Sequence, residues 1–168
     1  MAPLVRTSLA RAGHTPVLRQ QAKHRQKISI AAALRRSLCS GHVSMAYEIF
    51  PDSYVDNFRY AEFLRTRVLG CWRGPVMLLQ DGAALHRGDW IEELVEDVER
   101  LEMHDLPPYA PELNPVEPLW NWSKDKELAN FLPDDIDQLT IAAQYLMETA
   151  AHDQRRLQSF CDAVPLKW

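Results

Sequence analysis

Hydrophobic and polar positions divide the chain into segments with strand-like and helix-like periods. Short apolar or alternating runs predict strands, whereas apolar residues at every third or fourth position predict helices. The predicted strands are residues 4–9, 16–19, 27–34, 42–50, 76–79 and 101–104. The predicted helices are residues 54–71, 89–100, 116–129, 135–151 and 153–162. This order predicts one α/β domain over residues 1–168, a mixed sheet flanked by helices.

Three of the predicted strands have distinct patterns. Residues 27–34 are rich in Ile and Ala with few charges, which predicts a strand buried on both faces. Residues 42–50 alternate more clearly and are expected to be its antiparallel partner. Residues 76–79 form a short, continuously apolar strand that runs into Asp81. We therefore expect Asp81 to lie at the carboxyl end of a buried strand.

Composition is that of an ordinary globular protein, with 46% hydrophobic and 25% charged residues in 168. The sequence lacks an apolar run near eighteen residues and an amino-terminal apolar segment, so we expect neither a membrane span nor a signal peptide. The three cysteines are widely scattered, which indicates reduced thiols in a cytoplasmic protein rather than a zinc site or disulfides.

Charge is distributed unevenly along the chain. The first 47 residues carry eight Lys or Arg and no Asp or Glu, which gives this segment a charge of +8. The other residues carry −12, so the net charge of the whole chain is −4. A basic arm, residues 1–36, predicts contact with a polyanion such as nucleic acid, although a solvated basic face is an equally simple interpretation. The candidate phosphate-binding residues are Arg6, Arg11, Arg19, Lys23, Arg25 and Lys27.

Two acidic residues are candidates for chemistry. Asp81 follows a predicted strand, and Glu117 opens a predicted helix, with thirty-five residues between them. Each has a plain structural explanation, because an Asp after a strand often caps the next helix and a Glu is favoured in a first helical turn.

The segment around Glu117 changes this interpretation. It is Leu-Pro-Pro-Tyr-Ala-Pro-Glu-Leu-Asn-Pro-Val-Glu-Pro-Leu-Trp, residues 106–120, and Asp81 is followed by Gly-Ala-Ala-Leu-His. Both segments and their separation resemble the signature of Tc/mariner-like transposases, including the bacterial insertion-sequence branch. The resemblance extends over nearly the whole chain.

Membership of that family implies a ribonuclease-H-like fold in which three carboxylates bind two divalent metal ions, Mg²⁺ or Mn²⁺. Metal ions of this kind assist the cleavage and transfer of DNA strands. By the resemblance, Asp81 is the second catalytic carboxylate and bridges the metals, and Glu117 is the third. His86 matches a His that follows the second acid, and Asn114 is expected to shape the loop that aims Glu117.

The family's first catalytic Asp lies on an opening strand that should precede residue 1, since Pro3 to Pro16 resemble the segment after it. No Asp or Glu occurs before Glu48. The resemblance therefore predicts a chain that lacks the first strand and is inactive in strand cleavage by itself.

Two functional hypotheses remain open. The chain is either the catalytic part of a transposase completed by an upstream piece, or a non-enzymatic remnant that binds DNA or modulates an intact transposase. The expected partners are transposon-end and target DNA, with a homodimer or an assembly with a full-length or upstream-frame transposase. We expect a bacterial cytoplasmic protein, associated with the nucleoid when it is bound to DNA.

Overall fold

The computed structural model describes residues 11–14 and 27–166 of the chain. The strands predicted at residues 4–9 and 16–19 lie outside these ranges. The remaining predicted strands and all five predicted helices are present, with boundaries that differ by a few residues.

Within residues 11–14 and 27–166, four strands form two separate two-stranded sheets. Strand β1 (Ile28–Arg36) pairs antiparallel with β2 (Val43–Pro51), with Ala32 opposite Tyr47. Strand β3 (Val76–Gln80) pairs parallel with β4 (Leu101–Asp105). The predicted antiparallel partnership is therefore confirmed, and the expected mixed sheet is divided into an antiparallel and a parallel pair.

Helices and short turns connect and cover the strands. The helices are α1 (Asn57–Phe63), α2 (Asp89–Asp97), α3 (Val116–Trp122), α4 (Ile136–His152) and α5 (Gln154–Asp162). Two π-helical turns extend α1 and α3, η1 (Leu64–Val68) and η4 (Ser123–Glu127). Two 3₁₀ turns lie in the loops, η2 (Ala84–His86) and η3 (Pro111–Leu113).

Three helices begin at an Asp whose side chain caps the first turn. Asp56, Asp135 and Asp153 accept hydrogen bonds from backbone N–H groups of α1, α4 and α5, at 2.9, 2.8 and 3.0 Å. Such caps satisfy amide groups that have no partner within the helix. The starts of these helices are therefore encoded locally.

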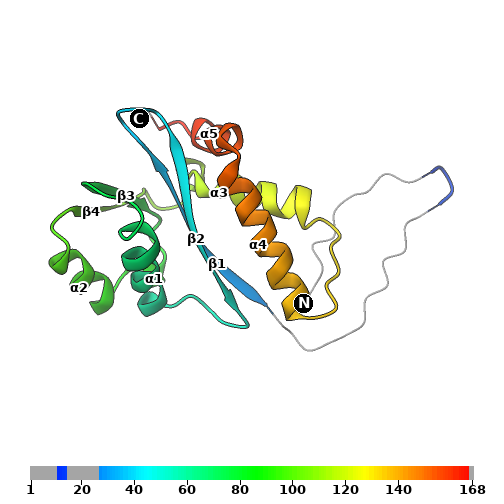
Figure 1. The fold of residues 1–168 in the computed structure, drawn as a ribbon, viewed down its shortest axis with the longest axis horizontal. Helices are drawn as coiled ribbons and strands as arrows, with labels where there is room; N and C mark the ends of the chain where they lie inside the picture. Colours follow the sequence, from blue (N-terminus) through cyan, green and yellow to red (C-terminus); the bar gives the residue numbers. More distant parts are fainter. Residues whose placement is uncertain (1–10, 15–26, 167–168) are drawn as a thin grey trace.

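The β1–β2 hairpin lies between two groups of elements, with α1, α2, β3 and β4 on one side and α3, α4 and α5 on the other (Figure 1). Alternate residues of β1 contribute to both interfaces. Ala31 and Ala33 belong to the first hydrophobic cluster, whereas Ile30, Ala32 and Leu34 pack against the second. The prediction that this strand is covered on both faces is confirmed.

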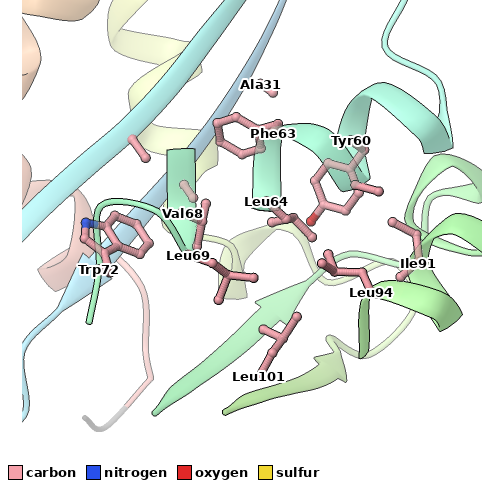
Figure 2. Packing of buried hydrophobic residues seen from close by; sticks show 13 residues of the cluster. Ala31, Tyr60, Phe63, Leu64, Val68, Leu69, Trp72, Ile91, Leu94 and Leu101 are labelled. Carbon is pink, nitrogen blue, oxygen red and sulfur yellow. The ribbon is translucent and has the colours of Figure 1, made fainter. Parts of the chain in front are cut away.

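The first cluster joins α1, η1 and α2 to the strands. Phe63, Leu64, Val68 and Leu94 are its most deeply buried members. Figure 2 shows Leu64 and Leu94 on the side of the β3–β4 pair and Phe63 on the side of Ala31. Burial of aliphatic and aromatic side chains is the main stabilising contribution to such a unit. The cluster thereby fixes the helices that support Asp81.

Two predictions need correction. Strand β3 is not fully buried, because Met77 is 65% exposed and only Gln80 is buried within it. The strand has one hydrogen-bonded neighbour, β4, among the described residues, so its other side is open. The helix predicted over residues 54–71 is shorter, and its last five residues form a π-helical turn in which Leu69 N–H donates to Leu64 O.

Candidate active site

A groove of about 410 Å³ runs between β1 and β3. It is lined by residues 30–36, by residues 75–81, and by side chains from α1 and from the start of α3. Asp81, His86, Asn114 and Glu117 all line it. The structure thus brings to one groove the four residues that the sequence singled out for chemistry.

Asp81 directly follows β3, and its carboxylate is held by local contacts. Its Oδ1 accepts a hydrogen bond from Ala83 N–H at 3.0 Å and lies 3.0 Å from Nδ1 of His86. The same Nδ1 lies 2.9 Å from the Asp81 carbonyl oxygen. Because both neighbours are acceptors, Nδ1 carries the hydrogen. Asp81 is therefore oriented by its own loop, with its side chain half-exposed.

His86 is in turn held against Tyr60 of α1. The two ring centroids are 4.4 Å apart, and the His86 side chain is mostly buried. The ring therefore lies between a buried aromatic side chain and the Asp81 carboxylate.

A hydrogen-bonded chain behind Asp81 links α1 to the ends of β3 and β4. The Tyr60 hydroxyl donates to Oε1 of Gln80 at 3.1 Å, and Nε2 of Gln80 donates to Asp105 Oδ1 at 3.2 Å. Arg87 also donates to Asp105, at 2.9 Å. Burial, with the negative charges of Asp81 and Asp105, raises the pKa of Tyr60, so its hydroxyl remains a donor at neutral pH.

Asp105 is a second carboxylate at the same end of the parallel pair, opposite Gln80. The hydrogen bond from Gln80, with the contact to Arg87, lowers the pKa of Asp105. Sequence reasoning missed this network. The signal available was position, since the carboxyl ends of neighbouring parallel strands meet at one edge of the sheet.

Glu117 lies in the first turn of α3, where the Pro-rich loop ends. Its backbone N–H donates to the carbonyl oxygen of Asn114 at 3.0 Å, and Oδ1 of Asn114 accepts from Val116 N–H at 3.1 Å. Asn114 thus accepts hydrogen bonds from two backbone N–H groups of the first turn of α3, just before the N-cap residue Pro115. Further along, Trp122 packs beside Phe160, with ring centroids 6.1 Å apart, as a core residue.

The donor set in the groove suits a hard cation. Asp81 and Glu117 provide carboxylate oxygens, the ligands that Mg²⁺ and Mn²⁺ prefer. Within residues 11–14 and 27–166, however, no three His, Cys, Asp or Glu side chains are grouped so as to hold a metal ion. The described part of the chain therefore brings two acidic side chains, Asp81 and Glu117, to the groove.

The candidate phosphate-binding residues are only partly described. Arg6, Arg19, Lys23 and Arg25 lie outside the described residues, and Arg11 lies in an exposed turn. Lys27 directly precedes β1, and its ammonium group lies over the Tyr54 ring. The last nine residues of the basic arm form β1, where Arg36 forms an ion pair with Asp162 at 3.0 Å. Among the described helices, none is long and apolar enough to cross a membrane.

The fold, with two carboxylates in the groove, is that of a ribonuclease-H-like α/β domain. Solved mariner transposases share this fold: the Mos1 paired-end complex with Mn matches with a TM-score of 0.68 and 20% identity, over 98% of this chain and 49% of that one. The Mos1 catalytic domain alone matches with a TM-score of 0.54 and 19% identity, over 82% of this chain and 76% of that one. The Mos1 strand transfer complex matches with a TM-score of 0.59 and 18% identity, over 97% of this chain and 47% of that one.

The sequence profile of the DDE superfamily endonucleases matches residues 2–140, and the chain belongs to this family. The matched range contains both Asp81 and Glu117, and the match confirms the assignment made from the signature. No curated protein sequence matched the chain. The chain spans about half the length of the matched protein chains in the Mos1 complexes.

Proposed function

We propose that this chain contributes two of the three carboxylates of a transposase active site that cleaves transposon-end DNA and joins it to target DNA. The observation that carries this proposal is the convergence of Asp81 and Glu117, from separate elements, on one groove. These are also the residues that the signature assigns to catalysis. We infer that the protein meets its DNA in the bacterial cytoplasm.

Asp81 and Glu117 would hold Mg²⁺ or Mn²⁺. Bound divalent ions activate the attacking oxygen and stabilise the leaving oxygen of an in-line phosphoryl displacement. Both hydrogen-bonding contacts of the Asp81 carboxylate use Oδ1 and hold the side chain in the groove. His86 orients Asp81, and Asn114 fixes the helical turn that carries Glu117.

The chain by itself should cleave DNA slowly or not at all. Two carboxylates leave a pair of divalent ions with excess positive charge, and preorganised electrostatic stabilisation is worth about 3–4 kcal/mol for one lost group. The missing ligand thus corresponds to a factor of roughly 10² to 10³ in rate.

Metal binding tests the site directly. Titration of the chain with Mn²⁺, followed by electron paramagnetic resonance of the free ion, should reveal weak binding that Asp81→Asn and Glu117→Gln each reduce. Glu112→Gln is the matched control, because Glu112 is an exposed acid in the same loop. Equal binding by all four proteins would refute the assignment. Robust Mg²⁺-dependent nicking of plasmid DNA that vanishes in Glu117→Gln would refute the proposed inactivity.

We propose that the basic arm binds DNA phosphates without reading the bases. Replacing Arg6, Arg11, Arg19, Lys23, Arg25 and Lys27 by Gln should then abolish binding of a labelled duplex. Binding by the unaltered chain should weaken by at least about tenfold between roughly 50 and 200 mM salt.

Replacing Arg65 and Arg67 is the control for the arm, because these residues already pair with Asp97 and Glu48 at 3.4 and 3.6 Å. Binding that is insensitive to salt, or that falls equally in the control, would exclude the arm as the DNA contact.

A second candidate function is a remnant that joins an intact transposase in a mixed assembly. Asp81 and Glu117 both line the groove, and a remnant would retain the same pair. Adding the chain to a working transposase should then lower strand transfer in proportion to the amount of chain added. The Asp81→Asn variant of this chain should lower strand transfer to the same extent.

A further inference from the structure

Gln80 is a buried polar residue at the end of β3, directly before Asp81, and it is 8% exposed. Burying an amide costs free energy unless its oxygen and its N–H groups find hydrogen-bond partners. In Gln80 the oxygen has one partner and the nitrogen has two, and the three partners belong to three different segments. A buried polar group that is fully satisfied in this way makes the segments that it joins rigid.

The neighbours of the Gln80 amide leave it one orientation. Its Oε1 accepts a hydrogen bond from the Tyr60 hydroxyl at 3.1 Å. Its Nε2 donates to Asp105 Oδ1 at 3.2 Å and to the His86 carbonyl oxygen at 3.3 Å. Rotating the amide by half a turn would direct its oxygen toward a carboxylate and a carbonyl group, which are both acceptors. The Asp105 carboxylate therefore keeps one N–H of the amide directed at His86.

His86 is held at two points as a result. Its ring Nδ1 lies 2.9 Å from the Asp81 carbonyl oxygen and 3.0 Å from Asp81 Oδ1, and its own carbonyl oxygen accepts from Gln80. The backbone N–H of His86 donates to Ala83 O at 3.0 Å, which is a contact within the same loop. Among the described residues, Gln80 is thus the side chain that ties the backbone of His86 to β3.

We propose that Gln80 is a positioning residue, whose amide holds the His86 backbone so that the His86 ring can orient the Asp81 carboxylate. Asp105 takes part by fixing the direction of the amide. The position of the ring follows from the contacts of the described residues alone, whereas its consequence for a bound metal ion rests on the proposed function.

The tautomer of His86 reports the position of its ring. A hydrogen on Nδ1 is required by the two acceptor atoms of Asp81, and a ring that has left them is no longer held in that tautomer. Long-range ¹H–¹⁵N correlation NMR of the full chain distinguishes the two tautomers, and the His86 signals are those that His86→Asn removes. Wild type at pH 8.5, well above the usual histidine pKa of about 6.5, should show the hydrogen of His86 on Nδ1.

The double variant Gln80→Glu/Asp105→Asn separates positioning from support of the fold. Its new carboxylate can accept from both the Tyr60 hydroxyl and the new amide, so α1, β3 and β4 are joined again without a change of net charge. It has no N–H for the His86 carbonyl oxygen. The urea midpoint should recover most of what Gln80→Glu alone loses, while His86 should show a mixture of tautomers. Asp105→Asn is the matched control, because Gln80 and its bond to His86 remain.

Three results would overturn the proposal. A pure Nδ1–H tautomer in the double variant would mean that Gln80 serves the fold alone. An equal mixture in Asp105→Asn would mean that the carboxylate, rather than the amide, positions the ring. A hydrogen on Nε2 in wild type would contradict the geometry itself. Gln80→Met keeps the length of the side chain without its donors, so it should show the same mixture and replaces the double variant if that protein does not fold.

Manganese separates this inference from the proposed function. Groups that orient a metal ligand from behind typically contribute roughly tenfold to a hundredfold in metal affinity. The double variant should therefore bind Mn²⁺ about tenfold more weakly than Asp105→Asn. A changed tautomer with unchanged Mn²⁺ affinity would overturn the step from His86 to Asp81. If wild type binds no Mn²⁺, the proposed function falls, and the tautomer measurement decides independently whether Gln80 positions His86.

Discussion

The two candidate carboxylates are held in place by different kinds of structure. In the Asp81 region, residues 57–105, the site is supported by polar contacts: Tyr60 to Gln80, Gln80 to Asp105, and His86 to Asp81. In the Glu117 region, residues 116–162, α3 is fixed by apolar packing against β1, α4 and α5. The Asp153 carboxylate in that region accepts the backbone N–H of Arg156 and caps α5.

Because of this difference, we expect Asp81 and Glu117 to respond differently to substitutions and to pH. A carboxylate supported by hydrogen bonds between side chains depends on the protonation and identity of each partner. A carboxylate carried by a packed helix depends mainly on the volume of the residues beneath it. We therefore expect Glu117 to respond mainly to cavities beneath α3, whereas Asp81, whose supporting helices rest on the first hydrophobic cluster, should respond in addition to changes of polar groups.

The largest effects should come from Leu119→Ala and Leu94→Ala, a matched pair in which each side chain is 0% exposed. Each variant should lower the free energy of unfolding by about 2–5 kcal/mol, the usual cost of a buried leucine with its cavity. Because β1 contributes to both hydrophobic clusters, each variant should still unfold in a single transition on urea titration. A second transition in Leu94→Ala would mean that the Glu117 region folds independently.

Arg100→Ala should have the next largest effect, within the Asp81 region. Its guanidinium group donates to the carbonyl oxygens of Leu69, Trp72 and Gly74, at 2.6, 2.9 and 2.9 Å. Removing a charged donor from carbonyl groups should cost about 1.5–3 kcal/mol of unfolding free energy. Arg100→Lys should recover part of this loss in the same urea titration. Equal stability of wild type and Arg100→Ala would show that water replaces these contacts.

Tyr60→Phe should lower the free energy of unfolding by about 1 kcal/mol at pH 8, because it removes one buried hydrogen bond. Burial raises the folded-state pKa of Tyr60 above its unfolded value near 10, so this stabilisation is present below pH 10 and is lost as pH rises above it. Wild type should therefore lose its advantage over the variant between pH 8 and pH 11, measured by urea titration. A constant difference would contradict a raised pKa.

Sequence reasoning succeeded where the controlling information is local. The apolar periods of α2, α4 and α5 and the alternation of β2 lie within a few residues of the features that they determine. Asp81 and Glu117 were found together because a signature resemblance links two segments that are distant in the chain. Their individual contexts predict no more than a turn and a helix start.

The remaining features depend on contacts between distant segments. The Tyr60–Gln80 bond joins residues twenty positions apart, and no periodicity indicates it. The π-helical turn after α1 breaks no apolar pattern, because Leu64 and Val68 remain buried within it. Met77 is 65% exposed, whereas its apolar neighbours predict a buried strand. In each case the sequence of the segment does not indicate which other segment packs against it in the fold.

Asp105→Asn should have the smallest effect and the most specific pH dependence. The hydrogen bond from Gln80 lowers the folded-state pKa of Asp105, with a contribution from Arg87. A carboxyl group of this kind stabilises the fold above its unfolded pKa near 4 and loses that contribution as pH falls through its lowered folded-state value. Wild type and variant should therefore differ at pH 7 and converge below pH 4 in urea titrations. Arg87→Gln should retain most of this dependence, because the Gln80 contact persists. If Arg87→Gln abolishes the dependence and Gln80→Met leaves it intact, the ion pair rather than the amide controls this carboxylate, and the polar support beside Asp81 is electrostatic in origin.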